Sequence, residues 1–203
     1  MTMPKPRAAS PDTVAGLRAG VERLLEGGRT YAEISIDDLV AEGGLAKSTF
    51  YVYFRDKTEL LRTLAAEVMK ALIDFEGAWW TLPPEAGKDE IHTGVLRMYQ
   101  AYHDHGALMA AIVDTTVHDR ELREQFASTM DGAVEAAAHH LRACQAVGIA
   151  PHGMDPEPTA YWLIWTLERG FYRMYADLKP AARKRRLAAA TDIIWHASRR
   201  ADA

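Results

Sequence analysis

The sequence has almost no cysteine, since Cys144 is the single one among 203 residues. One cysteine cannot form an intramolecular disulfide, so a disulfide scaffold is excluded and a reducing cytoplasm is expected. Long apolar runs are also missing, because none approaches the roughly 20 residues that a membrane-spanning helix needs. Lys5 and Arg7 near the N-terminus are not followed by an apolar segment, so neither a signal peptide nor a membrane partner is expected.

The sequence also has little excess charge of either sign. Its formal net charge is −4, which by itself does not favour a protein that binds nucleic acid. Residues 1–57 hold eight basic and eight acidic side chains, so all the excess negative charge lies in residues 58–203. A neutral N-terminal segment can still bind DNA through a local basic face, because neutralisation of phosphates dominates such affinity.

Strand signals are absent as well, since no alternating β-branched run is closed by a hairpin turn. Apolar side chains recur instead at helical spacing, and hydrophobic residues make up 48% of the total. The sequence therefore predicts an all-α protein of about nine helices. The expected helices cover residues 10–26, 35–42, 46–54, 56–76, 91–102, 107–114, 122–144, 157–177 and 181–195.

The most informative part of the chain is the pair of short helices around Gly43-Gly44. Two short helices joined by a glycine turn form a helix-turn-helix, whose second helix lies in the major groove of DNA. Phe50 and Phe54 share one face of the second helix, so they can anchor it to a core. Donor side chains suited to phosphates and base edges lie on or near the other side; they are Lys47, Ser48, Tyr51 and Tyr53.

This segment resembles the DNA-binding signature of the TetR family of bacterial transcriptional regulators. The residues that carry the resemblance are Gly43-Gly44-Leu45, Thr49-Phe50-Tyr51-Val52-Tyr53-Phe54 and Lys57. The resemblance implies a disordered tail over residues 1–9 and a three-helix DNA-binding domain over residues 10–56. Residues 57–203 would then form a helical bundle that binds a ligand and forms a dimer.

The resemblance also implies which side chains contact DNA. Thr49, Tyr51 and Tyr53 match family positions that contact phosphates, and Lys57 matches a lysine that contacts the DNA backbone. The complete expected set is Ser35, Lys47, Ser48, Thr49, Tyr51, Val52, Tyr53 and Lys57.

One residue departs from the family pattern. Ala46 stands where the family usually has a serine that caps the recognition helix. Loss of a capping hydroxyl costs about 0.5–2 kcal/mol of helix stability. We therefore expect the helix over residues 46–54 to be less ordered in the absence of DNA.

The second half of the chain is similar to one branch of the family, which includes the mycobacterial repressor of ethionamide activation. The short matches are Ala78-Trp79-Trp80, Leu82-Pro83, His92-Thr93-Gly94-Val95, Glu168-Arg169 and Ile194-Trp195. That branch implies a ligand cavity lined by Met98, Tyr102, Phe126, Ile164, Leu167 and Trp195. Because Ile164 and Leu167 replace polar amides of the branch, an apolar effector is expected.

The two C-terminal helices have apolar side chains on more than one side. In the family these helices pair with those of a second subunit, so a homodimer is expected, whereas the alternative is a purely internal core. A symmetric dimer predicts a palindromic operator, with recognition helices about 34–36 Å apart or a multiple of that distance. The function expected from the resemblance is a repressor that an apolar small molecule releases from its operator.

Several other features have simpler interpretations. The pairs His103/His105 and His139/His140 lack the spacing that puts two metal ligands on one helical face, so exposed histidines are expected rather than a metal site. The basic run Arg183–Arg186 is interpreted as a solvated helix face rather than a DNA contact. No cofactor is expected.

Two functional alternatives stay open at this point. One is a helical enzyme that uses Cys144 with His140 one turn away, although no carboxylate is evident to orient the pair. The other is a regulator that activates transcription or acts without a ligand, which the sequence does not separate from a repressor.

Overall fold

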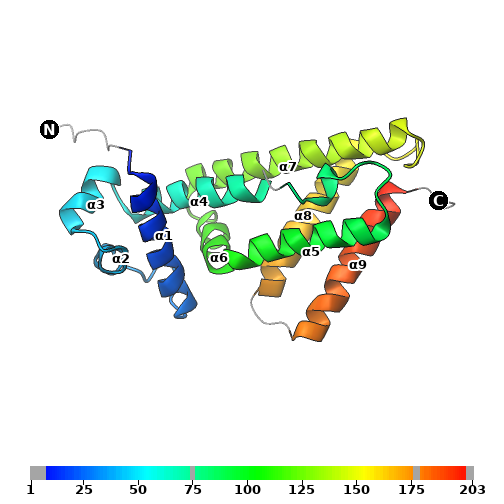
Figure 1. Cartoon of the computed structure of the whole chain (residues 1–203). Coiled ribbons are helices and arrows are strands. Elements are labelled where there is room, and N and C mark those ends of the chain that lie inside the picture. Colours follow the sequence, from blue (N-terminus) through cyan, green and yellow to red (C-terminus); the bar gives the residue numbers. More distant parts are fainter. Residues whose placement is uncertain (1–7, 74–75, 176–178, 200–203) are drawn as a thin grey trace. The chain divides into compact units, whose positions relative to one another are not determined.

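The structure is a computed structural model that describes residues 8–73, 76–175 and 179–199. These residues form nine α-helices and one short 3-10 helix, with no strand among them (Figure 1). The helices are α1 (Pro11–Glu26), α2 (Ile36–Gly43), α3 (Lys47–Tyr53), α4 (Lys57–Ile73), η1 (Trp79–Thr81), α5 (Lys88–Asp104), α6 (Gly106–Thr115), α7 (Arg120–Ala146), α8 (Pro156–Tyr175) and α9 (Pro180–Ser198). The predicted all-α class and the order of the helices are confirmed.

The differences from the predicted helices are small and local. The 3-10 helix η1 was not expected, and α5 begins at Lys88, three residues before the predicted position. The side chain of Glu90 accepts a hydrogen bond of 2.7 Å from the backbone N–H of Gly87, so it caps this earlier start. The predicted tail lies largely outside the described residues, and so does the predicted end of the eighth helix.

The chain divides into two compact units, and the expected domain boundary after residue 56 stays a prediction. The first unit contains the residues up to Val68 together with Ala107–Arg123, and the second contains the rest. Within the first unit, the guanidinium of Arg62 on α4 forms an ion pair of 2.6 Å with Asp119, which lies just before α7.

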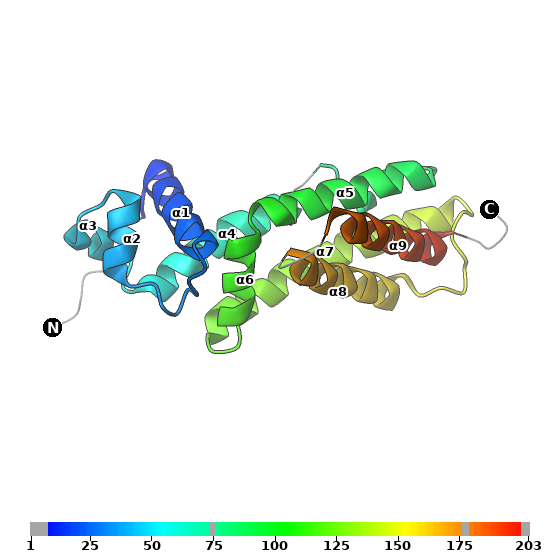
Figure 2. The ribbon, with the colours of Figure 1, turned by 90° about the horizontal axis from the view of Figure 1, so that it is seen from below.

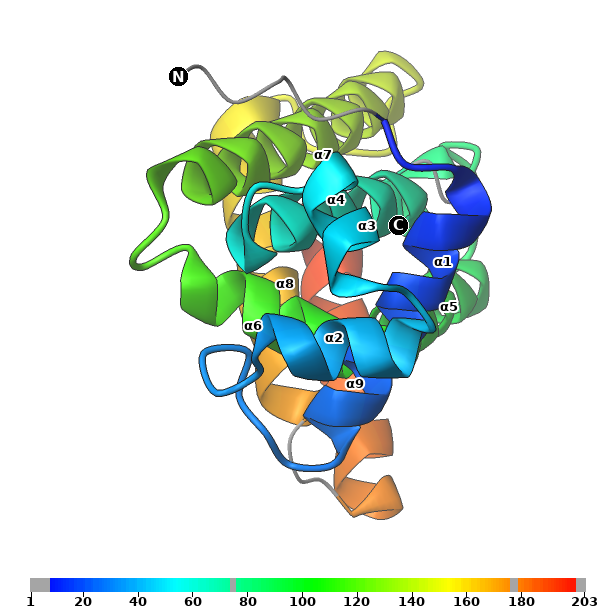
Figure 3. The same ribbon diagram turned by 90° about the vertical axis from the view of Figure 1, so that its left-hand side faces the viewer.

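The first unit has its core among short helices that approach closely (Figure 3). A Cβ on Gly20 of α1 would lie 3.0 Å from the Cβ of Glu42 on α2, and one on Gly43 would lie 2.8 Å from a methyl of Leu17. Glycine at these positions therefore lets α1 and α2 pack with little space between their backbones. Arg23 of α1 adds an ion pair of 2.9 Å with Glu42.

In the second unit, α9 contacts both α5 and α8 (Figure 2). Thr191 of α9 lies 2.9 Å from Nδ1 of His92 on α5, and Lys88 forms an ion pair of 2.6 Å with Asp192. Gly94 of α5 is buried, and a Cβ there would lie 3.1 Å from the backbone of Trp79. These contacts fix α5 against α9 and η1.

Candidate DNA interface and ligand site

Helix α2, which precedes the expected recognition helix α3, begins with a reciprocal cap. The Ser35 hydroxyl accepts a hydrogen bond of 3.1 Å from the backbone N–H of Asp38, and the Asp38 carboxylate accepts one of 2.8 Å from the backbone N–H of Ser35. Gly44 ends α2 with a left-handed backbone, at φ 65°. The predicted capping box is therefore confirmed. Ser35 is exposed, but its hydroxyl already takes part in this cap.

The two faces of α3 differ as the sequence predicts. Phe50 and Phe54 are buried, whereas Tyr51 and Val52 each keep 45% of their surface exposed. The Tyr51 ring meets the edge of the Phe50 ring at a centroid distance of 5.6 Å, so the buried ring supports the exposed one. Tyr53 is half-buried.

The other residues of α3 that are expected to contact DNA lie in its first turn. Ser48 is exposed and Thr49 is half-buried. The ammonium group of Lys47 is exposed and lies 2.8 Å from a carboxylate oxygen of Asp37, which raises the pKa of the lysine. Both partners are largely in solvent, so the pair is weak and can open when a phosphate approaches. As the sequence analysis expected, no side-chain hydrogen bond caps α3 at Ala46.

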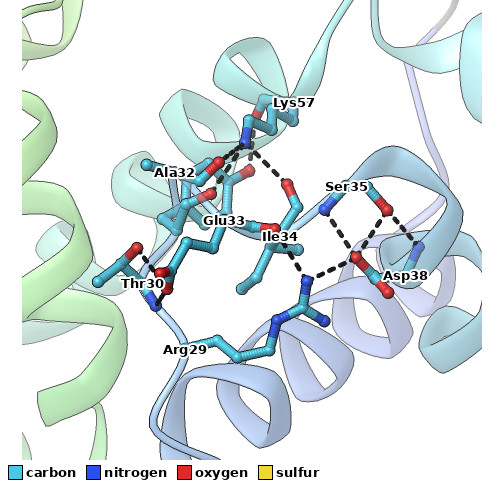
Figure 4. Close-up of polar contacts among 9 residues, drawn as sticks. Arg29, Thr30, Ala32, Glu33, Ile34, Ser35, Asp38 and Lys57 are labelled. Atoms are coloured by element: carbon cyan, nitrogen blue, oxygen red, sulfur yellow. Dashed lines mark hydrogen bonds and ion pairs between the residues drawn. The ribbon is translucent and has the colours of Figure 1, made fainter.

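The ammonium group of Lys57, which is expected to contact DNA, forms hydrogen bonds within the chain (Figure 4). Its ammonium group donates to the backbone carbonyls of Ala32 and Ile34 at 2.7 Å each, and to that of Tyr31 at 3.0 Å. Three bonds use all three N–H donors of a lysine. Burial lowers the pKa of Lys57, and the nearby charge of Arg29 lowers it further. A contact between this ammonium group and a phosphate would require some of these bonds to open.

The segment between α1 and α2 carries further bonds that hold those carbonyls in place. Arg29 donates to the Asp38 carboxylate and to the carbonyl of Glu33, each at 2.8 Å, and the Glu33 carboxylate accepts from Thr30 (Figure 4). Hydrogen bonds from Arg29 and Ser35 keep the pKa of Asp38 well below its usual range. The Tyr31 hydroxyl donates back to the carbonyl of Lys57.

All six residues expected to line a ligand cavity lie in the second unit, on α5, α7, α8 and α9. Tyr102, Phe126, Ile164 and Leu167 are buried, whereas Met98 and Trp195 are half-buried. Phe126 packs against Trp165 of α8 with ring centroids 6.1 Å apart. Their role in binding a ligand stays a prediction.

A groove of about 530 Å³ runs between α8 and α9. Leu167 also lines this groove, together with Leu163 and Ile194. Trp162 and Ile193 lie at the same groove and remain 69% and 55% exposed. Large apolar side chains gathered on an exposed surface are typical of a protein interface.

Sequence comparison places both parts of the chain in known families. Residues 18–64 match the family described as bacterial regulatory proteins of the tetR family. Residues 91–198, which are more than half of the chain, match the family described as the C-terminal domain of the transcriptional regulator EthR. The chain belongs to the EthR family of transcriptional regulators. The resemblances drawn from short motifs are confirmed.

Individual relatives agree with this assignment. The HTH-type transcriptional regulator EthR of Mycolicibacterium smegmatis is 28% identical over 190 residues, which are 93% of this chain and 87% of that protein. A TetR-family regulator structure from Rhodococcus sp. has a TM-score of 0.71 at 19% identity and covers 92% of this chain and 100% of its own. The SmeT–triclosan complex has a TM-score of 0.67 at 16% identity, with coverages of 92% and 89%.

This EthR-family chain has a buried acid, Glu168, beside the expected cavity residue Leu167. It was not among the residues expected to line the cavity. Glu168 of α8 is only 7% exposed, and burial raises its pKa. Both of its carboxylate oxygens are enclosed without a hydrogen bond, as are the Tyr102 hydroxyl and the Trp165 indole nitrogen. The available signal was an acidic residue in the middle of a helix that is apolar nearly all round, whereas Glu157 lies in its first turn.

In this EthR-family chain, His140 and Cys144 lie together in the protein interior. His140 is 4% exposed and packs edge-on against Trp79 at 5.5 Å, so the expectation that it is exposed is wrong. Cys144 lies 3.5 Å from His140 but is fully buried, and burial raises the pKa of its thiol. A protonated, enclosed thiol is unsuited to nucleophilic attack. Across the described ranges no three His, Cys, Asp or Glu side chains gather as metal ligands.

Two remaining sequence expectations concern the surface. In the basic run, Lys184, Arg185 and Arg186 are exposed, as a solvated face requires, and Arg183 stacks over Tyr99 at 5.6 Å. Among the described residues, no helix is long and apolar enough to cross a membrane.

Proposed function

We propose that the protein is a repressor that binds a palindromic operator as a homodimer and is released by a small molecule. The exposed face of α3 carries this proposal, because Tyr51 and Val52 stand in solvent while Phe50 holds the helix to the core. Exposed aromatic and hydroxyl groups on a recognition helix suit contacts with phosphates and base edges. Such a regulator would bind its operator in the cytoplasm.

The groove between α8 and α9 supports the homodimer. Its exposed Trp162 and Ile193 would be covered by the same two helices of a second copy. A two-fold axis would then set the two copies of α3 at a fixed separation and favour a palindromic operator.

Ligand release is supported by the C-terminal match and by the buried aromatic side chains of α5, α7 and α8. The SmeT structure is a complex with triclosan, so a protein of this fold has been seen with a small molecule bound. A ligand can release the operator only if it binds the released state more tightly than the DNA-bound state.

The test is a gel-shift titration with the DNA upstream of the protein's own gene. Lys47→Ala should weaken binding and reduce the slope of log affinity against log salt by about one, because one phosphate contact is lost. Lys88→Ala is the matched control, because Lys88 is also half-exposed and paired with an aspartate, but on α5. Equal affinities of the two variants, or binding that does not depend on salt, would reject operator recognition by α3.

The release step is tested in the same titration by adding candidate ligands. If the protein is a repressor, deletion of its gene should raise transcription of the gene beside its operator. A fall in transcription on deletion would instead assign an activator.

A further inference from the structure

Several side chains of the second unit have an enclosed polar atom without a hydrogen bond in the part of the chain that the structure describes, and three of them are expected cavity residues or their neighbours in sequence. The enclosed atoms of these three are both carboxylate oxygens of Glu168, the hydroxyl of Tyr102 and the indole nitrogen of Trp165. Trp165 and Glu168 lie one turn apart on α8. Burial raises the pKa of the Tyr102 phenol most and the charge of Glu168 raises it further, and the Tyr102 ring packs against Phe171, which lies one turn from Glu168 on α8. Buried polar atoms are nearly always hydrogen-bonded, so such a group needs a functional explanation.

Arg169 does not satisfy the Glu168 carboxylate. Its Nε lies 3.9 Å from the nearer carboxylate oxygen, which is beyond hydrogen-bond distance. The Arg169 side chain is 57% exposed, and its guanidinium lies 5.1 Å above the ring of Tyr172. The charge of Arg169 offsets the effect of burial on the pKa of Glu168 only in part, so that pKa stays raised.

The surroundings of Glu168 are aromatic. Phe171, one turn along α8, packs against Tyr99 and Tyr102 of α5 with centroid distances of 5.6 and 5.9 Å. On the other side, Trp165 packs against Phe126 of α7. A carboxyl group enclosed by rings is unfavourable unless the ionised form gains an opposite charge or the protonated form donates a hydrogen bond.

From this arrangement we infer that the effector is an apolar molecule that carries a protonated amine, and that Glu168 and Tyr102 bind the amine. The inference rests on the proposed function, because it places the effector among the side chains of α5, α7 and α8. An ammonium group donates to the carboxylate and to the phenol oxygen, and its charge compensates that of Glu168. The apolar part packs against Phe126 and Phe171. The expected apolar effector is thereby refined to one with a single basic end.

Three probes with the same tail and different ends test this inference: octylamine, octan-1-ol and octanoate. Their affinities for the full chain are measured by calorimetry, and their release of operator DNA by gel shift. Octylamine should bind about tenfold or more tightly than octan-1-ol, because a charge-assisted hydrogen bond replaces a neutral one. Octanoate should bind most weakly, because it brings a second negative charge beside Glu168.

Substitutions test whether Glu168 and Tyr102 cause the preference for the amine. Glu168→Gln should remove the preference for the amine, whereas Tyr102→Phe should reduce it. Glu157→Gln is the matched control, since Glu157 is an exposed acid on the first turn of the same helix. If Glu168→Gln does not fold, the role of Glu168 is tested instead by measuring proton release when the unaltered protein binds octylamine. Binding of octylamine at mildly acidic pH should release protons from Glu168, seen as a binding heat that depends on the buffer.

The outcomes separate this inference from the proposed function. Equal affinity for amine and alcohol, or a preference that survives Glu168→Gln, overturns the amine site while leaving the repressor intact. Amine binding that depends on Glu168 but leaves the operator complex unchanged supports the site and contradicts ligand release.

Discussion

The ammonium group of Lys57 joins the start of α4 to the segment between α1 and α2. It donates to three carbonyls that lie more than twenty residues earlier in the chain, the closest at 2.7 Å. The Tyr31 hydroxyl returns a bond to the carbonyl of Lys57. These bonds bring the entry of α2 and the exit of α3 to one place, so Lys57 positions the helix-turn-helix from inside the protein.

We therefore expect Lys57→Met to lower the free energy of unfolding by about 1–3 kcal/mol, since hydrogen bonds to a charged group are lost. Denaturation in urea measures this change. Lys47→Met is the control and should stay within about 0.5 kcal/mol of the unaltered protein, because its ion pair is exposed. If Lys57→Met weakened DNA binding with no loss of stability, a direct phosphate contact would be its main role.

Glu168 predicts a dependence of stability on pH. Burial raises the pKa of its carboxyl above the ordinary value of 4.5, so the native state keeps this proton to a higher pH than the unfolded chain. Between those two pKa values the native state binds more protons, and the free energy of unfolding falls as pH rises. Glu168→Gln has no charge to bury, so its stability relative to the unaltered protein should increase from acidic to neutral pH.

Denaturation in urea across this pH range measures the difference for Glu168→Gln, with the exposed Glu157→Gln as control. A difference that is constant across the pH range would contradict a raised pKa at this position.

At the scale of elements, α3 is the short helix that is expected to contact DNA, and it begins without a side-chain cap. The N-cap residue Ala46, just before Lys47, has an extended backbone, at φ −74° and ψ 143°, which is the conformation in which a serine caps a helix. The preceding helix α2 has such a cap at Ser35. We therefore expect the N-terminus of α3 to be less stable than that of α2, although one glycine turn joins the two helices.

Ala46→Ser should stabilise the protein by about 0.5–2 kcal/mol, because its hydroxyl can accept a backbone N–H of the first turn. Ser35→Ala should destabilise it by a similar amount. Urea denaturation measures both, and hydrogen exchange of the α3 amides shows whether the gain is local. Faster exchange in α3 of Ala46→Ser would contradict the assignment of a vacant cap.

At the scale of the whole molecule, the proposed homodimer would form through the groove between α8 and α9. In one copy this groove exposes Trp162 and Ile193, and its lining also includes the buried Leu163 and Ile194. Burial of apolar surface contributes about 25 cal/mol per Å², so a second copy on this face gains stability mainly from these side chains.

A charge at the groove should separate the two copies. We expect Ile193→Glu to convert the dimer into a monomer at micromolar concentration and to weaken operator binding, since two linked recognition helices bind more tightly than one. Analytical ultracentrifugation measures the first effect and gel shift the second. Val117→Glu is the control, because Val117 is 66% exposed but lies far along the chain in the turn before α7. A dimeric Ile193→Glu would place the interface elsewhere.

The sequence by itself determined the helices, the capping box at Ser35 and the two faces of α3. These features depend on spacing within one or two turns, and apolar periodicity, caps and glycine report that spacing directly. The family motifs added the type of regulator, because Gly43-Gly44-Leu45 and the aromatic run after Thr49 are specific in combination.

Only the tertiary structure decided which side chains have partners. Lys57 matched a DNA-contacting position, yet its ammonium group bonds to carbonyls from another part of the chain. His140 and Glu168 have polar side chains, yet both are buried because neighbouring helices cover them. Burial and hydrogen bonding between distant residues arise from packing, which the local pattern of a sequence does not record.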